Sequence, residues 1–405
     1  MMKTGGTMLY RKVPKNGDEL SILGFGAMRL PQRLNRIDEK SAAPLIYHAI
    51  DQGLNYVDTA WPYHGGQSEP FVGKILSVDG YRDKIKLATK LPHWQTKNST
   101  DMHDILNKQL ERLRTDHIDY YLVHNLNGAS WKRAREKGVI EFLDQALESG
   151  KILNAGFSYH GMAMDFNAIV DDYDWTFCQM QYNYLDTQSQ GGTAGLEYAA
   201  SQNLAIIVME PLRGGNLAKT PPPEIRKIWD SAETQKTPAE WSLRWLWDKP
   251  QVTVILSGMN HMDQINENLA IASTAVPTSM SEPDKQRVNQ AADTFRSLMK
   301  AGCTGCQYCM PCPHGVNIPF CFDTYNSKTV FKDKRATYQY LVINGGIVSS
   351  KPGLASQCTE CGACLSKCPQ SLPIPDLLKD VEKEFERFWT KPFLNIVKSV
   401  MRIQH

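Results

Sequence analysis

Short apolar runs alternate with amphipathic stretches from about residue 21 to residue 275. The apolar runs are rich in Val, Ile, Leu and Tyr without strict polar alternation, which is typical of strands covered on both faces. Eight of these runs are predicted strands: residues 23–28, 55–59, 85–91, 118–124, 153–158, 177–182, 205–211 and 252–257. Seven amphipathic stretches are predicted helices: residues 39–52, 69–76, 100–114, 133–149, 193–202, 238–247 and 261–273.

Alternating strands and helices predict a parallel sheet with helices outside it. Eight such units over this length fit an α/β protein of the (β/α)8 TIM-barrel type. The alternative is a doubly wound open sheet, which usually carries a G-x-G-x-x-G turn after its first strand. Gly24-Phe25-Gly26 lacks both the third glycine and the start of a helix. The barrel is therefore the predicted fold.

The segments around this repeat carry simpler signals. Residues 9–13 and 20–23 flank the turn-forming residues 15–18, which predicts a β-hairpin that caps the bottom of the barrel. Residues 220–223 are predicted to be a loop or spacer, because they include three consecutive prolines. Helical stretches follow residue 280: residues 281–300, a segment around 334–342, and one or two amphipathic helices in 375–405.

Two runs of closely spaced cysteines dominate the C-terminal part. The first run is Cys303, Cys306, Cys309 and Cys312, and the second is Cys358, Cys361, Cys364 and Cys368; a proline follows each. In two-cluster ferredoxins a C-x2-C-x2-C-x3-C-P run supplies thiolate ligands to 4Fe–4S clusters. The second run has this spacing, and the first is one residue shorter before its last cysteine. Two 4Fe–4S clusters and single-electron transfer are therefore predicted.

Zinc is the alternative, because paired C-x2-C units also build zinc sites. Each run, however, supplies three close cysteines and a fourth before proline, which favours iron–sulfur clusters. In two-cluster ferredoxins the fourth cysteine of one run binds the cluster of the other run. This exchange would join Cys368 to the first three cysteines of the first run, and Cys312 to the first three of the second. The domains are thus a barrel with its hairpin over residues 1–280 and a mainly helical, ferredoxin-like iron–sulfur domain with C-terminal helices over 281–405.

Composition narrows the class of protein. The 405 residues are 42% hydrophobic and 22% charged, as in ordinary soluble globular proteins, and the formal charge is only +2. Such a small charge does not indicate a nucleic-acid partner. The first ten residues do not resemble a signal peptide, and no apolar stretch is long enough for a transmembrane segment. A cytoplasmic protein is expected, since a reducing compartment suits thiolate ligands.

Four polar residues fall at or just after the ends of early predicted strands, where barrel enzymes carry their active sites: Asp58, Tyr63, Lys90 and His124. A tyrosine hydroxyl has a pKa near ~10, which is too high for efficient proton transfer at neutral pH. A Lys90 cation beside Tyr63 would favour the phenolate, and Asp58 would hold the ammonium. With His124 as hydrogen-bond donor, the set would polarise and protonate a carbonyl while a hydride arrives.

The alternative for these four is a structural Asp–Lys pair beside a loop tyrosine and a core histidine. Any one of the residues alone fits that interpretation better. Their joint occurrence at consecutive strand ends favours the catalytic interpretation.

Longer stretches of the chain match one family. They are GLNYVDTAWPYHGGQSE (53–69), LATK (87–90), LERLRTDHIDYYLVH (110–124), GKILNAGFS (150–158), QMQYN (179–183), MEPLRGG (209–215) and ILSGMNHMDQINENLA (255–270). Over about residues 9–275 the chain resembles the aldo/keto reductases, in particular the subgroup with a C-terminal two-cluster domain. The resemblance implies a TIM barrel and nicotinamide-dependent carbonyl reduction or alcohol oxidation. It puts Asp58, Tyr63, Lys90 and His124 on the catalytic positions, with Tyr63 as proton donor.

The resemblance also implies a cofactor site with some departures. The expected cofactor-binding positions are Ser158, Gln181, Met209, Pro211, Leu212, Gly258, Asn260, Glu267 and Asn268. Tyr159 replaces the Asn that commonly follows the serine, and Met209 replaces the aromatic residue that usually stacks on the nicotinamide. Asn260 stands where many members place Lys or Arg beside the adenosine phosphate. NADP(H), NAD(H) and a flavin therefore all stay open as the barrel cofactor.

Three functions are compatible with these features. The first is an iron–sulfur oxidoreductase that couples two-electron chemistry on a small-molecule carbonyl or alcohol to a ferredoxin-like electron carrier. The second is an NAD(P)H-dependent carbonyl reductase whose clusters are structural. The third is a non-catalytic redox sensor that uses the barrel to bind a dinucleotide. The presence of all four catalytic residue types argues against the third.

Overall fold

The computed structural model describes residues 7–161, 163–346 and 352–388, together with residues 390, 392 and 394. It divides into two compact units. The barrel unit comprises Met1–Leu212 and Ala239–Lys285, and the cysteine unit comprises Arg213–Pro238 and Gln286–His405. The change near residue 285 lies close to the expected boundary at 280. The segment 213–238, expected within the barrel domain, groups with the cysteine unit.

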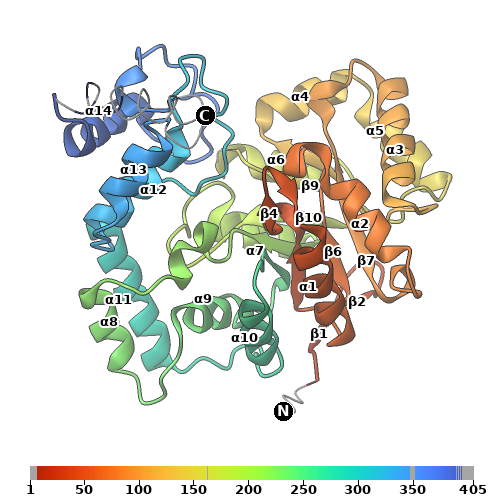
Figure 1. The fold of residues 1–405 in the computed structure, drawn as a ribbon. Helices are drawn as coiled ribbons and strands as arrows, with labels where there is room; N and C mark the ends of the chain where they lie inside the picture. Colours follow the sequence, from red (N-terminus) through yellow and green to blue (C-terminus); the bar gives the residue numbers. More distant parts are fainter. Residues whose placement is uncertain are drawn as a thin grey trace. The chain divides into compact units, whose positions relative to one another are not determined.

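The barrel unit contains a closed barrel of parallel strands (Figure 1). Its strands are β3 (Leu23–Gly26), β6 (Tyr56–Asp58), β7 (Lys86–Leu91), β8 (Tyr120–Leu126), β9 (Ala155–Tyr159), β10 (Phe177–Gln181), β11 (Ala205–Met209) and β12 (Val252–Ser257). Strand β12 pairs with β3, as Ile255 faces Leu23 across the pair, and this pairing joins the last barrel strand to the first. The predicted TIM barrel is confirmed, and the open sheet is excluded because the barrel is closed.

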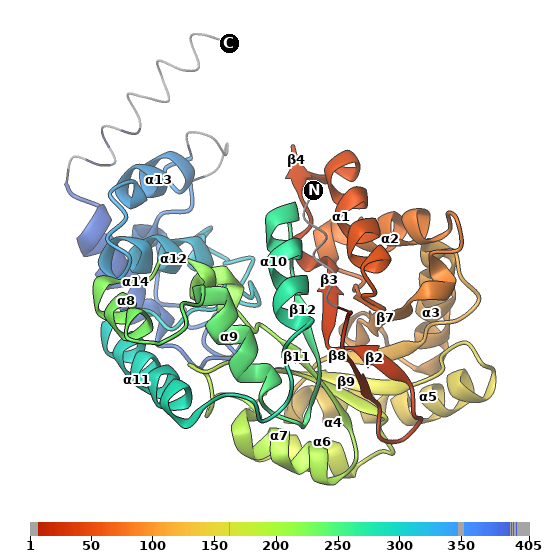
Figure 2. The same ribbon diagram turned by 90° about the horizontal axis from the view of Figure 1, so that it is seen from below.

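Helices surround the strands of this unit (Figure 2). They are α1 (Glu39–Asp51), α2 (Ser68–Leu76), α3 (Ser99–Leu113), α4 (Gly128–Glu136), α5 (Val139–Glu148), α6 (Ala163–Asp171), α7 (Gly192–Ser201), α9 (Pro238–Trp247) and α10 (Met262–Ala272). The single helix predicted over 133–149 is wrong: α4 and α5 are separate helices. Gly138 has φ of 83° between them, a left-handed conformation that ends one helix and that glycine adopts without a Cβ clash. Helix α6 was not predicted.

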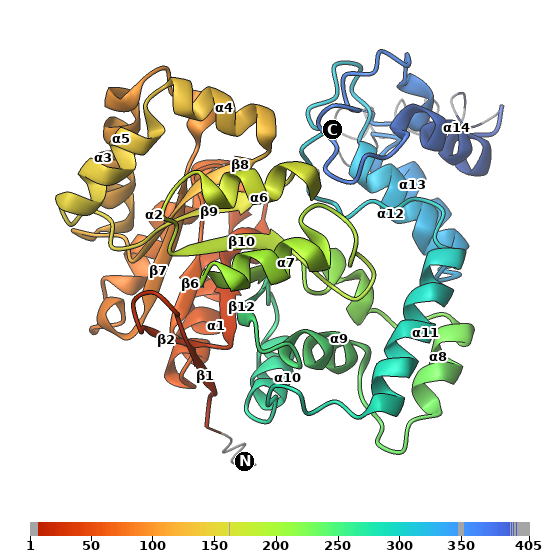
Figure 3. The ribbon, with the colours of Figure 1, turned by 180° about the vertical axis from the view of Figure 1, so that it is seen from behind.

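The N-terminal hairpin closes one end of the barrel (Figure 3). Strands β1 (Tyr10–Lys12) and β2 (Glu19–Ser21) pair antiparallel. Val13 and Leu20 are buried in one core cluster with Tyr56, Tyr120 and Phe177, which lie at the beginnings of three barrel strands. The hairpin therefore covers the amino-terminal end of the barrel, as the sequence predicts.

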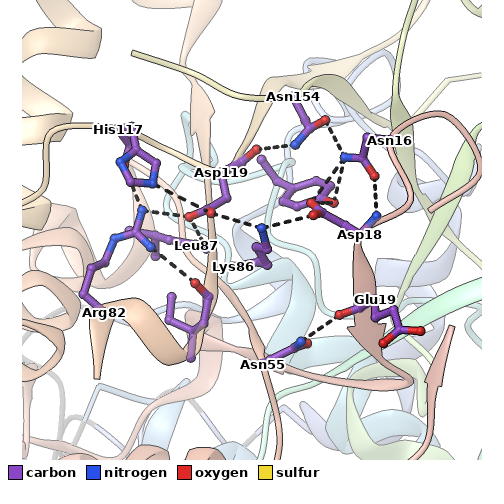
Figure 4. Close-up of polar contacts among 12 residues, drawn as sticks. Asn16, Asp18, Glu19, Asn55, Arg82, Lys86, Leu87, His117, Asp119 and Asn154 are labelled. Carbon is purple, nitrogen blue, oxygen red and sulfur yellow. Dashed lines mark hydrogen bonds and ion pairs between the residues drawn. The ribbon is translucent and has the colours of Figure 1, made fainter. Parts of the chain in front are cut away.

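Charged residues reinforce this end (Figure 4). Asp119 accepts a hydrogen bond from the Leu87 N–H at 3.0 Å and pairs with Arg82 at 2.7 Å. Lys86 lies 3.2 Å from Asp18, in the hairpin turn, and 3.9 Å from Asp119. These contacts join the hairpin to the amino-terminal ends of the strands. Active sites of TIM barrels lie at the opposite, carboxyl-terminal end.

The cysteine unit is mainly helical. Its helices are α8 (Pro223–Asp230), most of α11 (Glu282–Leu298), α12 (Ile318–Thr329), α13 (Ala336–Ile343) and α14 (Ile374–Phe385). Helix α8 begins at Pro223, inside the predicted loop, because proline fits the first turn of a helix. It lies beside α11 (Figure 3), where the Arg287 guanidinium donates to the Ser231 hydroxyl at 3.1 Å.

The two cysteine motifs pack against the hydrophobic core of this unit. Phe322, Tyr340, Val381 and Phe385 are buried there, and most of the motif cysteines lie against this cluster. Helix α14 accounts for the start of the predicted C-terminal helices, and most of the remaining tail lies outside the described residues. In the described part of the chain, no helix has the length and apolar character needed to span a bilayer.

Candidate active site and cysteine sites

The structure brings the four predicted catalytic residues together at the carboxyl ends of β6, β7 and β8. Asp58 ends β6, Tyr63 lies in the following short 3-10 turn, and Lys90 and His124 lie on β7 and β8. Lys90 Nζ lies 2.7 and 2.6 Å from the two carboxylate oxygens of Asp58 and 2.9 Å from the carbonyl oxygen of Thr59. The same nitrogen lies 3.4 Å from the Tyr63 hydroxyl oxygen. One ammonium group therefore connects the carboxylate to the phenol.

Burial and ion pairing have opposite effects on the pKa values of Asp58 and Lys90. Burial raises the pKa of Asp58 and lowers the pKa of Lys90, and the contact between the two opposes both shifts. A second carboxylate contact and the Thr59 carbonyl fit a protonated amine, so we assign a charged pair. The Lys90 cation then stabilises negative charge that develops on the Tyr63 oxygen.

His124 is a neutral imidazole in this setting. Burial lowers its pKa well below the usual value, and the positive charge of Lys90 acts in the same direction. Its ring meets the Tyr63 ring edge-on at 6.2 Å between centroids, and the Trp94 ring lies 5.3 Å away. A neutral imidazole retains one ring N–H, which can be donated to a carbonyl oxygen beside Tyr63.

Sequence reasoning missed a group of buried residues that support Lys90. Glu69 is fully buried, and its Oε1 accepts from the Thr89 hydroxyl at 2.8 Å and from the Gln109 amide at 2.6 Å. The Gln109 amide also donates to the Lys90 carbonyl oxygen at 3.0 Å. The Gln179 side chain hydrogen-bonds to Asp58. Glu69 and Gln179 lie inside family-like stretches, which is the only sequence signal for them.

Two further histidines flank His124 and were also missed. His93 follows β7 and His160 follows β9, so three adjacent strands each bring a histidine to the barrel mouth. Burial lowers the pKa of both to about 4. The His93 side chain hydrogen-bonds to the backbone of His124, which helps to fix the end of β8.

The two residues expected to hold the nicotinamide amide lie on neighbouring strands. Ser158 is buried on β9, and its Oγ accepts from the Asn125 N–H at 2.7 Å, so its own hydroxyl hydrogen can still be donated. Gln181 ends β10, where its amide nitrogen donates to Asp186 at 3.1 Å and its oxygen accepts from Gln190 at 2.9 Å. A bound carboxamide would have to replace one of the Gln181 contacts.

The remaining expected cofactor positions lie at the ends of β11 and β12. Met209 ends β11, ahead of Pro211 and Leu212, and Gly258 and Asn260 follow β12. Asn268 donates from α10 to the Ser257 hydroxyl at 3.1 Å, and Glu267 lies beside it on the helix.

A charged pair joins the segments that follow β3 and β11. Arg29 and Glu210 are 3.4 Å apart, and a Cβ on Gly258 would come within 3.1 Å of the Arg29 side chain. The role of each of these positions in binding a dinucleotide stays a prediction.

The eight motif cysteines form two groups of four. Cys303, Cys306, Cys309 and Cys368 line one hollow. Cys312, Cys358, Cys361 and Cys364 line a second hollow. Each group takes three thiols from one run and the fourth from the other, which is the exchanged arrangement of two-cluster ferredoxins.

The backbone repeats itself around the two groups. Gly305 and Glu360 occupy the same motif position and both have positive φ, and so do Gln307 and Gly362. The Gly305 N–H donates to the Cys303 sulfur at 3.4 Å, and the Glu360 N–H donates to the Cys358 sulfur at 3.5 Å. Hydrogen bonds to the ligating sulfurs are one of the ways a protein tunes iron–sulfur clusters.

The four thiols around each hollow match the ligand set of a 4Fe–4S cluster. Burial raises the pKa of the Cys303 and Cys309 thiols to about 12, and a cluster would supply the positive charge that thiolates there need.

The exchanged grouping leads to a direct prediction. Replacing Cys312 with Ala should remove the cluster held by Cys358, Cys361 and Cys364 and spare the other, since its thiol lines the second hollow. Iron and sulfide analysis of the anaerobic protein should give about half of the wild-type content, because one of two four-iron clusters is lost. EPR of the reduced protein should retain one signal, which must vanish when Cys306→Ala is added. Loss of the signal that depends on Cys306 in Cys312→Ala alone would instead show ligation within each run.

Comparison with known proteins agrees with this geometry. The aldo/keto reductase family model matches residues 22–283, and a 4Fe-4S dicluster domain model matches residues 302–372. The chain is 27% identical over 270 residues to the aldo-keto reductase YhdN of Bacillus subtilis, covering 64% of this chain and 76% of that protein. It is 23% identical over 320 residues to the L-galactose dehydrogenase of Arabidopsis thaliana, covering 71% and 95%.

A solved structure shows the same fold. The aldo-keto reductase AKR11C1 from Bacillus halodurans, in its holo form, aligns with a TM-score of 0.60 and 24% identity over 70% of this chain and 96% of its own. The family model and these relatives define an oxidoreductase, and its fold is a TIM barrel. The chain belongs to the aldo/keto reductase family and carries a C-terminal 4Fe-4S dicluster domain.

Proposed function

We propose that this protein couples aldo/keto-reductase chemistry on a small-molecule carbonyl or alcohol to one-electron transfer through two 4Fe–4S clusters. The observation that supports it best is the pair of four-cysteine hollows in a chain whose barrel also carries the Asp58–Lys90 pair beside Tyr63. A ferredoxin-like protein is the proposed electron partner, and the cytoplasm is the proposed compartment, since reducing conditions keep thiolates available.

The chain's own residues would handle the proton. In carbonyl reduction the carbon gains a hydride and the oxygen gains the Tyr63 proton, which gives the alcohol. Lys90 holds the resulting phenolate until water returns a proton, and Asp58 keeps the ammonium in position. His124 donates to the substrate oxygen and fixes its distance from Tyr63. The reverse sequence oxidises an alcohol.

The number of electrons that each group carries gives a reason for a barrel and two clusters to occur in one chain. A nicotinamide supplies or takes a hydride, which carries two electrons, whereas a 4Fe–4S cluster passes one electron at a time. Oxidation of one alcohol releases two electrons and two protons, so two clusters match one turnover.

Anaerobic stopped-flow spectroscopy tests the coupling. Iron, sulfide and flavin are first quantified, and the oxidised protein is then mixed with NADH, NADPH or an alcohol. Cluster absorbance should bleach and an EPR signal should appear, and viologen reduction should be lost in Cys303→Ala. Cys178→Ala is the matched control, because Cys178 is a buried thiol on β10 outside both motifs.

Two outcomes would contradict the proposal. Aldehyde reduction by NAD(P)H that is unchanged in Cys303→Ala, with no change in cluster absorbance, would mean that the clusters are structural. Zinc in place of iron in the purified protein would rule out one-electron transfer through the two cysteine sites.

A flavin found at one per chain would identify the group that splits the electron pair.

A further inference from the structure

Arg213 is a buried residue of the cysteine unit that lies beside the first cysteine group. It is the first residue of the segment that belongs to the cysteine unit, and it directly follows Leu212 in the chain. Its side chain is buried, with 5% of the residue exposed. The guanidinium donates to the Gly302 carbonyl oxygen at 2.7 Å and contacts the Met299 sulfur at 2.9 Å. These contacts hold a cation in a fixed place.

That place is next to the first cysteine group. Gly302 directly precedes Cys303, and a Cβ on Gly302 would lie 3.5 Å from the Arg213 guanidinium. The guanidinium is therefore held beside the residue that precedes Cys303, one of the four cysteines that line the first hollow.

The charges around the second group are different. Glu360 lies within the second motif, but it is exposed and pairs with Lys379 at 2.7 Å. An exposed pair of opposite charges is screened by water and salt and has little effect on a neighbouring group. A buried cation is screened much less.

We propose that Arg213 is a positioning residue for the first cluster, held by Cys303, Cys306, Cys309 and Cys368, and that its charge raises the reduction potential of that cluster. This inference rests on the proposed function, because it requires iron–sulfur clusters in both hollows. Reduction adds one electron to a cluster with no bond made or broken. A fixed neighbouring cation stabilises the added negative charge, and environment of this kind sets cluster potentials.

A redox titration of the full chain tests this. The protein is reduced stepwise with dithionite under argon, and each cluster is followed by EPR. Arg213→Gln, which removes the charge and keeps an amide donor, should shift one of the two midpoint potentials to a more negative value and leave the other unchanged. Arg213→Lys, which keeps the charge, should keep this midpoint potential close to the wild-type value. Lys219→Gln is the control: it removes a half-exposed cation of the same segment, which pairs with Asp323 at 3.4 Å, and should move neither potential.

Single-cluster variants assign the shift. With Cys361→Ala, which removes the second cluster, Arg213→Gln should lower the remaining potential; with Cys306→Ala it should not. An equal shift of both clusters, no shift, or the same shift in Lys219→Gln would overturn the inference while leaving the proposed function intact. If Arg213→Gln loses iron from the first site, Arg213→Lys decides: retention at the wild-type potential supports the role of the charge, and loss overturns it. Zinc or absent iron in the wild-type protein would instead defeat the proposed function itself.

Discussion

Replacing Tyr63 with Phe is expected to lower kcat for carbonyl reduction by about 10²–10⁴-fold, the usual contribution of a positioned acid. The hydroxyl lies 3.4 Å from Lys90 Nζ, and the substitution removes only that oxygen. KM should change little, because the proton moves in the transition state and not on binding. Steady-state kinetics with a series of aldehydes, under anaerobic conditions, gives both constants.

A matched tyrosine separates chemistry from packing. Tyr47 lies on α1, and its hydroxyl donates to the Ile75 carbonyl oxygen at 3.1 Å. Tyr47→Phe should keep the wild-type kcat, and both variants should unfold at close to the wild-type temperature. If Tyr63→Phe keeps a wild-type kcat, another residue is the proton donor and the assignment of the mouth residues is wrong.

Replacing Lys90 with Met should destabilise the barrel by about 3–5 kcal/mol, since it leaves the buried Asp58 carboxylate without its partner. Only 1% of the Lys90 side chain and 4% of the Asp58 side chain are exposed, so water cannot replace the ammonium. The pKa of Asp58, already raised by burial, should then rise further above its unfolded value. The loss of stability should therefore be smaller near pH 4 and should grow as pH increases.

The double variant makes this prediction specific. Asp58→Asn combined with Lys90→Met removes both charges, and should recover much of the free energy of unfolding while kcat stays near background. Lys74→Met is the control, because Lys74 pairs with Glu39 at 2.6 Å and both side chains are at least half exposed; it should change stability by less than about 1 kcal/mol. Urea unfolding followed by tryptophan fluorescence measures each variant. A double variant that is stable and active would mean that the pair is dispensable for the chemistry.

Local pattern was sufficient for much of this protein. Asp58, Lys90 and His124 each interrupt or close an apolar run that a strand needs, so their position at the barrel mouth follows from the strands alone. The cysteines were found because cluster ligands require short spacings. The sequence pattern does not predict the break between α4 and α5. The apolar spacing continues across Gly138, and only the left-handed backbone there ends the helix.

Residues that act through distant partners escaped the sequence. Glu69 meets Gln109 forty positions further along the chain, and the only sequence signal for either is the family-like stretch that contains Glu69. Arg213 reaches Gly302 across 89 positions, after the chain has left the barrel unit for the cysteine unit. Such contacts depend on how separate segments pack, which short-range periodicity does not encode.

The amino-acid sequence by itself determined the alternation of strands and helices, the residue types at the strand ends and the presence of eight ligand-type thiols, because each depends on neighbours a few positions apart. Only the tertiary structure decided that the barrel closes, that one ammonium joins Asp58 to Tyr63, and which four thiols line each hollow. These are distances between residues remote in the chain, and packing of the whole core sets them.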